Sequence, residues 1–258
     1  MLRKRLIPRI LVQRFRNNNV AVISKKFQNF TVTGDPESQF KILQSNLADE
    51  VSIINLHRGG NNPIPEFVKL LSIIVNGSST PITSGGGIKL PVDVDLFMGT
   101  GIEKISIPIL SNYSNLNTIK YALGQYGSQS IQICLDYVKY DNFYLIRNFE
   151  KRFVLNELLD LIKIYFEEGA GEIVLTDINK DGSKLGLGVE LIEPIKSLIN
   201  APIIVAGGAC SISDFANALS LGADGVISGT YFAKKDHSLI QLRSAIYGQG
   251  INVRNLIS

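Results

Sequence analysis

The chain has 258 residues and a formal net charge of +3 at pH 7, with 45% hydrophobic and 19% charged residues. This composition supplies enough apolar side chains for a large buried core and excludes general disorder. The small positive charge suits anionic small molecules, and no basic run is long enough to indicate nucleic-acid binding. A length of about 250 residues is typical of one (β/α)₈ barrel.

The beginning of the chain is basic, like the front of a signal peptide, but its apolar run is soon interrupted by Pro8, Arg9 and Arg14. The interruption comes too early for an export signal, and no apolar segment approaches the length of a membrane span. The two cysteines, Cys134 and Cys210, are too few and too far apart for a disulfide framework or a metal cluster. We therefore expect a cytoplasmic protein with free thiols, no metal, no cofactor and no membrane contact.

Short runs rich in Ile and Val alternate along the chain with longer segments of helical pattern. The runs lie at Leu6–Val12, Val51–Asn55, Pro81–Ser84, Lys104–Ile107, Ile131–Asp136, Glu172–Asp177, Ile203–Ala206 and Gly225–Ser228. Continuous apolar strands between amphipathic helices are typical of a parallel sheet covered by helices. Eight such units predict a single (β/α)₈ TIM barrel over residues 1–258. An open doubly wound sheet is the alternative, but no glycine-rich fingerprint follows the first strand.

The second half of the chain repeats features of the first at a nearly constant separation of 121 or 122 residues. The matched positions are Glu50 with Glu172, Gly85 with Gly207, and Gly101 with Gly222. Three strand contexts with nearly one offset indicate an internal repeat. We predict two duplicated half-barrels, at about residues 1–122 and 123–258.

Glycine pairs follow the last two predicted strands, on the face where barrels carry their active sites. Gly207 and Gly208 follow the seventh strand, and Gly229 and Thr230 follow the eighth. Glycines let backbone N–H groups approach an anion, and Thr230 adds a hydroxyl donor at the start of a helical segment. The pattern predicts a phosphate-binding site, although the glycines could also serve only to turn the chain.

The first half contains a matching but incomplete site. Gly85, Gly86 and Gly87 follow the third strand, yet the positions equivalent to Gly229 and Thr230 are Pro108 and Ile109. Proline has no N–H to donate and isoleucine has no hydroxyl. A substrate with phosphates at both ends would therefore lose one of its two anchors.

A series of short motifs resembles the cyclase subunit of imidazole glycerol phosphate synthase over nearly the whole chain. The motifs are Lys4-Arg5-Leu6-Ile7-Pro8, Gly34-Asp35-Pro36, Gly85-Gly86-Gly87-Ile88, Tyr126-Gly127-Ser128-Gln129, the run from Gly169 to Thr176, Asp181-Gly182-Ser183-Lys184, Gly207-Gly208-Ala209 and the run from Gly250 to Arg254. Each motif alone is weak, but their order and spacing together are specific. The resemblance implies a duplicated half-barrel with a glutaminase partner on its N-terminal face. It also implies that ammonia passes through the barrel to the opposite face, where an imidazole ring is closed.

The resemblance further assigns four charged residues to an ammonia gate at the N-terminal face, namely Arg5, Glu50, Lys104 and Glu172. Each lies at the start of a predicted strand, and two cations with two anions can compensate each other in a partly buried ring. The alternative is that these charges only stabilise the bottom of the barrel, since strand ends are often charged.

The family is expected to use two aspartates as general acid and base, and only one is present here. Asp136 fills one role, whereas the other position is Leu11, whose side chain cannot transfer a proton. Two further family positions also differ, because an aspartate is replaced by Asn55 and a loop lysine by Ile23. These losses gather in the first half of the predicted active face.

Three other positions are assigned to the substrate loops. Asp181, with Gly182 and Ser183, lies in the loop that the family places near the substrate phosphate, and Thr176 ends the preceding strand. His57 follows the second strand and is a candidate replacement acid or base, although a lone histidine is more often a bystander.

The segment from Arg14 to Thr33 is predicted to be a long mobile loop that could act as a lid, or simply be disordered.

The leading hypothesis is a synthase-type subunit of a two-protein glutamine amidotransferase with a changed substrate. The resemblance suggests amidine formation on a nucleotide-activated sugar for bacterial surface polysaccharide, with a third amidotransferase enzyme as a further partner. The first alternative is a true imidazole glycerol phosphate synthase cyclase in histidine biosynthesis. The second is a non-catalytic activator of the glutaminase.

Overall fold

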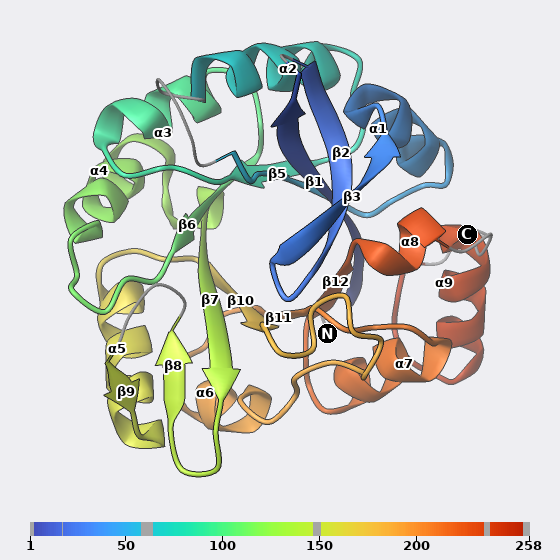
Figure 1. Ribbon diagram of the computed structural model, residues 1–258. Coiled ribbons are helices and arrows are strands. Elements are labelled where there is room, and N and C mark those ends of the chain that lie inside the picture. The colour runs from blue at the N-terminus through green and yellow to red at the C-terminus, as the bar shows by residue number, and fades with distance from the viewer. Residues whose placement is uncertain (1–2, 17, 58–63, 147–150, 235–237, 255–258) are drawn as a thin grey trace.

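The computed structural model describes residues 3–16, 18–57, 64–146, 151–234 and 238–254. Eight parallel strands pair in a closed ring, in which the last barrel strand pairs with the first (Figure 1). In ring order the strands are β1 (Arg5–Phe15), β4 (Val51–Asn55), β5 (Ile82–Gly85), β6 (Lys104–Pro108), β7 (Ile131–Lys139), β10 (Glu172–Asp177), β11 (Ile203–Ala206) and β12 (Gly225–Ser228). The prediction of a (β/α)₈ barrel is confirmed, and each barrel strand overlaps one of the eight predicted runs.

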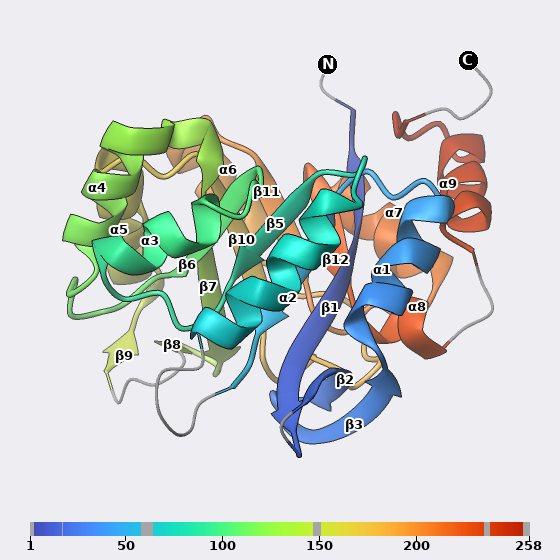
Figure 2. The ribbon, with the colours of Figure 1, turned by 90° about the horizontal axis from the view of Figure 1, so that it is seen from above.

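Helices surround the strand ring on its outside (Figures 1 and 2). They are α1 (Pro36–Ser45), α2 (Ile64–Asn76), α3 (Pro91–Met98), α4 (Leu116–Tyr126), α5 (Leu155–Glu167), α6 (Ile192–Leu198), α7 (Ile212–Ser220), α8 (Thr230–Lys234) and α9 (Leu239–Gly248), with a 3₁₀ turn, η1, at Ser128–Ser130. No helix in the described ranges is both long and apolar enough to cross a lipid bilayer.

Some family motifs have a direct structural explanation at the ends of helices. In the motif that begins at Gly34, the Asp35 side chain accepts a hydrogen bond from the Ser38 N–H at 2.7 Å, and Pro36 opens α1. A side-chain acceptor before a helix and a proline at its first position both favour helix initiation there. Ser211 and Asp214 form a reciprocal capping box at the start of α7.

Alternation along the strands divides the barrel into an outer and an inner core. Outward side chains such as Leu6, Ile53 and Leu135 join the large cluster beneath the helices. A second, smaller cluster lies inside the barrel and consists of Ile7, Val174, Ile204, Ala206 and Ile227, with Cys134 packed against it. Because successive strand residues point to opposite faces, Arg5, Ile7, Arg9 and Leu11 share the inner face of β1.

The predicted mobile loop from Arg14 to Thr33 is largely strand, and the expectation of an irregular segment is wrong. The end of β1 pairs antiparallel with β2 (Asn18–Lys25), which pairs with β3 (Gln28–Gly34). The run Val20-Ala21-Val22-Ile23 supplies the reason, because Ala21, Val22 and Ile23 are buried and extend the sheet. Residue 17 of this segment lies outside the described residues.

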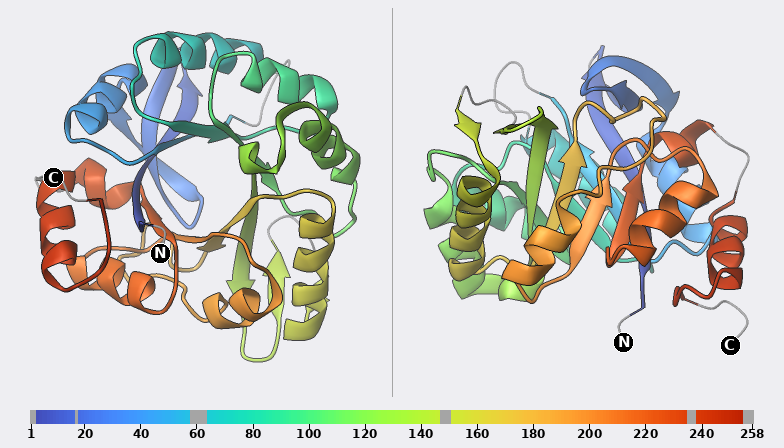
Figure 3. Two further views of the ribbon diagram at one scale, coloured as in Figure 1. Left: turned by 180° about the vertical axis from the view of Figure 1, so that it is seen from behind. Right: turned by 90° about the horizontal axis from the view of Figure 1, so that it is seen from below.

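A smaller antiparallel extension continues from β7 through β8 (Tyr144–Ile146) to β9 (Arg152–Phe153). The β2–β3 hairpin and the β8–β9 strands lie at one end of the barrel, and the chain termini lie toward the other (Figures 2 and 3). Both antiparallel extensions therefore lie at the carboxyl ends of the parallel strands.

The last long helix is tied to the barrel by a buried arginine. Arg243 of α9 is 2% exposed and donates to the Leu47 carbonyl at 2.9 Å and to Asp49 Oδ1 at 2.7 Å. The other oxygen of Asp49 accepts the Leu6 N–H at 3.0 Å. One carboxylate thus connects α9, the approach to β4 and the first barrel strand.

Replacing this arginine is expected to destabilise the whole barrel. Arg243→Met keeps the apolar stem but leaves Asp49 buried without its cation, so the free energy of unfolding should fall by about 3 kcal/mol. Chemical denaturation followed by circular dichroism measures the change. Lys41→Ala, in the exposed pair with Glu37, is the control and should leave the midpoint unchanged. A loss in Arg243→Met no larger than in this control would contradict the assignment.

Candidate functional site

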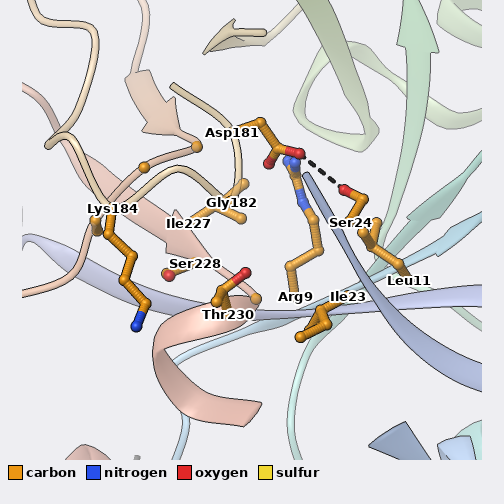
Figure 4. A pocket seen from close by; sticks show the side chains of 14 residues that line it. Arg9, Leu11, Ile23, Ser24, Asp181, Gly182, Lys184, Ile227, Ser228 and Thr230 are labelled. Atoms are coloured by element: carbon orange, nitrogen blue, oxygen red, sulfur yellow. Dashed lines mark hydrogen bonds between the residues drawn. The ribbon is translucent and has the colours of Figure 1, made fainter. Parts of the chain in front are cut away.

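A pocket opens at the carboxyl ends of β1, β11 and β12 and encloses about 440 Å³ of space not filled by atoms, part of it open to solvent (Figure 4). It is lined by Arg9, Leu11, Ile23, Ser24, Asp181, Gly182, Lys184, Gly207, Gly208, Ala209, Ile227, Ser228, Gly229 and Thr230. The structure therefore brings together six of the predicted substrate and phosphate residues, which come in pairs from three segments far apart in the sequence. This is the face on which barrel enzymes place their chemistry.

The loop after β10 forms one wall of the pocket and is fastened to the β2–β3 hairpin. Asp181 accepts a hydrogen bond from the Ser24 hydroxyl at 2.8 Å and from the Phe27 N–H at 3.4 Å. Its carbonyl oxygen accepts the Lys26 N–H at 2.9 Å. Gly182 has a φ of +63°, and a Cβ there would lie 2.0 Å from the Ser24 carbonyl oxygen. Only glycine permits so close an approach of loop and hairpin.

Backbone donors line the opposite wall of the pocket. The N–H groups of Gly207, Gly208 and Gly229 have no backbone or side-chain acceptor within the described residues. Gly208 has a φ of +101°, and a Cβ would lie 2.1 Å from the Gly186 carbonyl oxygen. Thr230 adds its hydroxyl to the same lining. Unpaired N–H groups around a concave surface are suited to binding an anion such as phosphate.

Ser183 does not line the pocket, although the sequence motif predicts it as a phosphate-binding residue. Its hydroxyl donates instead to the Lys180 carbonyl at 2.6 Å. The next residue, Lys184, does line the pocket and has a left-handed φ of +63°. Such a conformation in a non-glycine residue costs free energy, and it occurs often at functional sites.

Asp136 lies on the inward row of β7, is half-buried, and pairs in register with Thr176 of β10. Thr176 is fully buried, and its hydroxyl has no hydrogen-bond partner among the described residues. Leu11, 7% exposed, lines the pocket at the position where the family resemblance requires an aspartate. The face thus has one of the two expected carboxylates and an apolar side chain in place of the other.

His57 follows β4, half-buried, and its backbone N–H donates to Asn55 Oδ1 at 3.1 Å. It does not line the pocket. Its neighbour Arg58 lies outside the described residues.

The incomplete first-half site has no free donors at its key positions. Ile109 is buried, and its N–H already donates to the Cys134 carbonyl at 2.9 Å, while the Pro108 carbonyl accepts the Asn115 amide at 2.7 Å. A Cβ on Gly86 would lie 2.1 Å from the Asn55 carbonyl oxygen, and Gly85 is equally crowded by Ser106. Close strand packing is therefore sufficient to explain Gly85 and Gly86, and neither lines the pocket, nor does Gly87.

Arg9 and Lys184 line the pocket although neither was predicted from the sequence as a site residue. Arg9 was considered only as an interruption of an apolar run, whereas its side chain extends from the barrel interior toward Asp181 (Figure 4). The available signal was the two-residue period, because Arg9 shares the inner face with Arg5 and Leu11. A cation on the inner face of a barrel strand is costly unless it has a partner or a ligand.

At the other end of the barrel, the four predicted gate residues form one ion-pair network. Arg5 donates to Glu50 at 2.7 Å and to Glu172 at 2.6 Å, and Lys104 lies 3.2 Å and 3.1 Å from the same two carboxylates. Gln132 donates to Glu172 at 2.6 Å and Thr83 donates to Glu50, so both carboxylates also have neutral donors. The ring closes the N-terminal mouth of the barrel with salt bridges.

The carboxylates at the two ends of the barrel have pKa values shifted in opposite directions. Burial alone would raise the pKa of Glu172, but Arg5 and Lys104, with the hydrogen bonds of the ring, hold that pKa below its usual value. Burial raises the pKa of Asp181 at the pocket, against the lowering effects of Ser24 and Arg9. Burial also raises the pKa of Cys134 to about 12, so this thiol is protonated at neutral pH and is not an activated nucleophile.

No cluster of histidine, cysteine or carboxylate side chains in the described ranges could hold a metal ion. The pocket itself is lined by one carboxylate, Asp181, by glycine backbone and by the cations Arg9 and Lys184.

The fold and the pocket define a (β/α)₈ barrel with a pocket lined by backbone N–H groups at the carboxyl ends of its last two strands and an ion-pair ring at the opposite mouth. Residues 5–238 match the family described as histidine biosynthesis protein. The chain belongs to this family.

Individual relatives are similar in sequence to this chain over nearly its whole length. The chain is 32% identical over 238 residues to the imidazole glycerol phosphate synthase subunit HisF of Saccharolobus solfataricus, covering 88% of this chain and 91% of the relative. It is 30% identical over 262 residues to the "Putative imidazole glycerol phosphate synthase subunit hisF2" of Prochlorococcus marinus, covering 98% and 99%. The resemblance predicted from the motifs is confirmed, as is the assignment to a synthase-type family of enzyme subunits.

The ion-pair ring should make stability depend on acidic pH. Because the pKa of Glu172 is lower in the folded than in the unfolded protein, the ring stabilises the fold above the ordinary value of 4.5. This contribution should be lost as the pH falls from 4.5 through the folded pKa. Glu172→Gln should be less stable at neutral pH and should lose less stability over that acidic interval. Urea unfolding at a series of pH values measures both, and parallel profiles for the two proteins would contradict the expectation. Glu37→Gln, in an exposed pair, is the control.

Proposed function

We propose that this chain is the synthase subunit of a two-protein glutamine amidotransferase. A separate glutaminase would dock at the N-terminal mouth and release ammonia, which would cross the barrel to a phosphorylated substrate at the carboxyl end. The observation that carries the proposal is the ring of Arg5, Glu50, Lys104 and Glu172 across the mouth opposite the pocket. Well-packed apolar residues in place of a buried ion-pair network are often neutral or stabilising, so stability alone does not account for four charges in this layer.

The interior between the two ends supports passage of a small neutral molecule. Above the charged ring lies the apolar cluster that contains Ile7, Val174 and Ile227. An ammonium ion would lose its hydration there at a large cost in free energy, whereas neutral ammonia loses much less. Such an interior favours delivery of ammonia in the form that attacks carbon, because only neutral ammonia has a free lone pair.

The pocket supports a substrate with one phosphate-type group at its anchored end. The open N–H groups of Gly208 and Gly229, with the Thr230 hydroxyl, are suited to that group. The first-half counterpart offers Pro108 and an engaged Ile109 N–H instead. A change of substrate relative to the family follows, because a molecule with phosphates at both ends would be held by one end only.

The missing aspartate supports a change of chemistry as well as of substrate. Leu11 cannot act as an acid or a base, and loss of one such group typically lowers a rate about 10²–10⁴-fold. Together with this change, the family resemblance suggests amidine formation on a nucleotide-activated sugar for bacterial surface polysaccharide, in the cytoplasm, as the reaction. A third amidotransferase enzyme would receive the ammonia if the barrel itself does not catalyse the transfer.

A second candidate is the cyclase reaction of histidine biosynthesis itself. The names of the relatives and the retained Asp136 favour it. A turnover assay with the family's open-chain ribonucleotide substrate and saturating ammonium, without glutaminase, separates the two. We expect no ring closure, because Leu11 cannot exchange the required proton. Ring closure at an ordinary enzymatic rate would overturn the proposal of a changed substrate in favour of the histidine enzyme.

A third candidate, a non-catalytic activator of the glutaminase, is tested at Asp136. Asp136→Asn keeps the size of the side chain and removes its acid–base function, so amination of the barrel's own substrate should fall at least about 100-fold. Glutaminase activation by the variant should remain. Unchanged product formation by the complete complex carrying Asp136→Asn would favour the activator, because the amination would then occur outside the barrel.

Breaking the ring should uncouple the two reactions. In Lys104→Ala, glutamine hydrolysis by the bound glutaminase should continue while a larger share of the ammonia escapes, because Glu50 and Glu172 lose a shared cation. The ratio of glutamate formed to aminated product, measured in the complex, should rise severalfold above the unmodified protein. Lys120→Ala removes an exposed lysine paired with Glu168 and is the matched control. Equal coupling in both variants would be evidence against a gate.

A further inference from the structure

Arg9 is the most unusual charged side chain in the barrel interior. It lies on the inner face of β1 between Ile7, in the apolar interior cluster, and Leu11 at the pocket. Its Nε is buried and has no hydrogen-bond partner among the described residues. Arg5, two inward positions earlier, instead shares its guanidinium between two carboxylates. Arg9 is therefore a half-buried cation with a buried Nε–H that the described residues leave without an acceptor.

The nearby carboxylate does not account for this arginine. Arg9 extends toward Asp181 (Figure 4), and its charge lowers the pKa of that group. Asp181, however, already receives hydrogen bonds from the Ser24 hydroxyl and the Phe27 N–H. These donors hold the carboxylate in place without the guanidinium. An anion entering the pocket can thus contact Arg9 while the loop remains fastened to the hairpin.

The position of Arg9 relative to the backbone donors indicates what kind of anion would fit. Arg9 lines the same pocket as Gly208, Gly229 and Thr230, and Lys184 adds a second cation. The backbone donors suit one phosphoryl group, and the guanidinium fork suits another anionic group beside it. Among the described residues of the first-half counterpart, the Ile109 N–H is engaged and Pro108 has no N–H to donate. The favourable positions for negative charge are therefore adjacent to each other.

We propose that Arg9 makes this pocket a site for two adjacent phosphoryl groups, so that the ligand is a diphosphate ester such as a nucleoside diphosphate derivative. One phosphoryl group binds the N–H groups of the loops after β11 and β12, and the other binds the Arg9 guanidinium. The inference rests on the proposed phosphate pocket and specifies its substrate class. It excludes a ligand with single phosphates at its two ends as the best fit.

Calorimetric titration of the full chain with three probes at one ionic strength tests the proposal. Inorganic phosphate reports the backbone subsite, pyrophosphate carries two adjacent groups, and fructose 1,6-bisphosphate carries two distant ones. The unmodified protein should bind pyrophosphate at least about tenfold more tightly than either of the other probes, because charge-assisted hydrogen bonds to the second group are added.

The arginine variants locate the second subsite. In Arg9→Ala the affinity for pyrophosphate should fall about 10–100-fold and the affinity for phosphate less than about threefold. Arg9→Met keeps the apolar stem and is a second variant if Arg9→Ala does not fold, which circular dichroism shows. Arg14→Ala removes an arginine of the same strand that pairs with Glu66 outside the pocket. It changes the net charge equally and should leave all three affinities unchanged.

Different results would overturn different parts of the argument. If phosphate binds but pyrophosphate binds no more tightly, or if the Arg9 variants weaken both probes equally, the diphosphate subsite is wrong and the phosphate pocket stands. A preference for fructose 1,6-bisphosphate would show that the two anionic groups are not adjacent. If none of the three probes binds the unmodified protein, the phosphate pocket itself fails, and the proposed function with it.

Discussion

Each strand of a closed parallel ring must pair with a neighbour on both sides, and this constraint fixes which side chains face the axis. A shift of one residue in any strand would exchange its inward and outward rows. In β1 that exchange would place Leu6 and Ile10 inside and Arg5 and Arg9 beneath the helices. The continuous pairing from β10 through β12 and β1 to β7 prevents it. The charges at the two ends of the barrel are thus positioned by backbone pairing before any side chain interacts.

The barrel accommodates its interior charges in two different ways. At the N-terminal mouth, Arg5 and Lys104 face Glu50 and Glu172, and two neutral donors complete the network. In a network of this kind, the attraction between opposite charges offsets the free-energy cost of removing each charge from water. Near the carboxyl end, Arg9 retains an unfilled buried donor. The mouth thus has a network of mutually compensated charges, whereas the pocket end has a cation with one buried donor that the described residues leave without an acceptor.

The barrel itself could be predicted from the sequence because buried parallel strands are apolar on both faces. The bounds of β4, β10, β11 and β12 agree with the predicted runs for this reason, since their residues are almost entirely buried. The β2–β3 hairpin was missed because only Ala21–Ser24 is buried and all but one residue of β3 is exposed. A segment stabilised by pairing with β1, with few buried side chains of its own, has the composition of a loop.

The site was predictable where glycines mark it and not where a single charge does. Gly207, Gly208 and Gly229 stand out because backbone geometry restricts those positions to small residues. Arg9 gives no such signal, since one arginine in an apolar run is equally compatible with a strand end. Its importance depends on the inward row of β1 and on the loop after β10, which are brought together only by the closed ring.

Ring closure also has consequences for how the chain folds during synthesis. The ring closes where Arg5 pairs with Gly225, and beside it Lys4 and Asp224, 220 residues apart, form an ion pair at 2.9 Å. One edge of β1 therefore stays uncovered until almost the entire chain has left the ribosome. Contacts of such long sequence separation form slowly. Until they form, the unpaired strand edge promotes aggregation. The yield of folded protein should thus depend on what shields that edge in the nascent chain more than on the stability of the finished barrel.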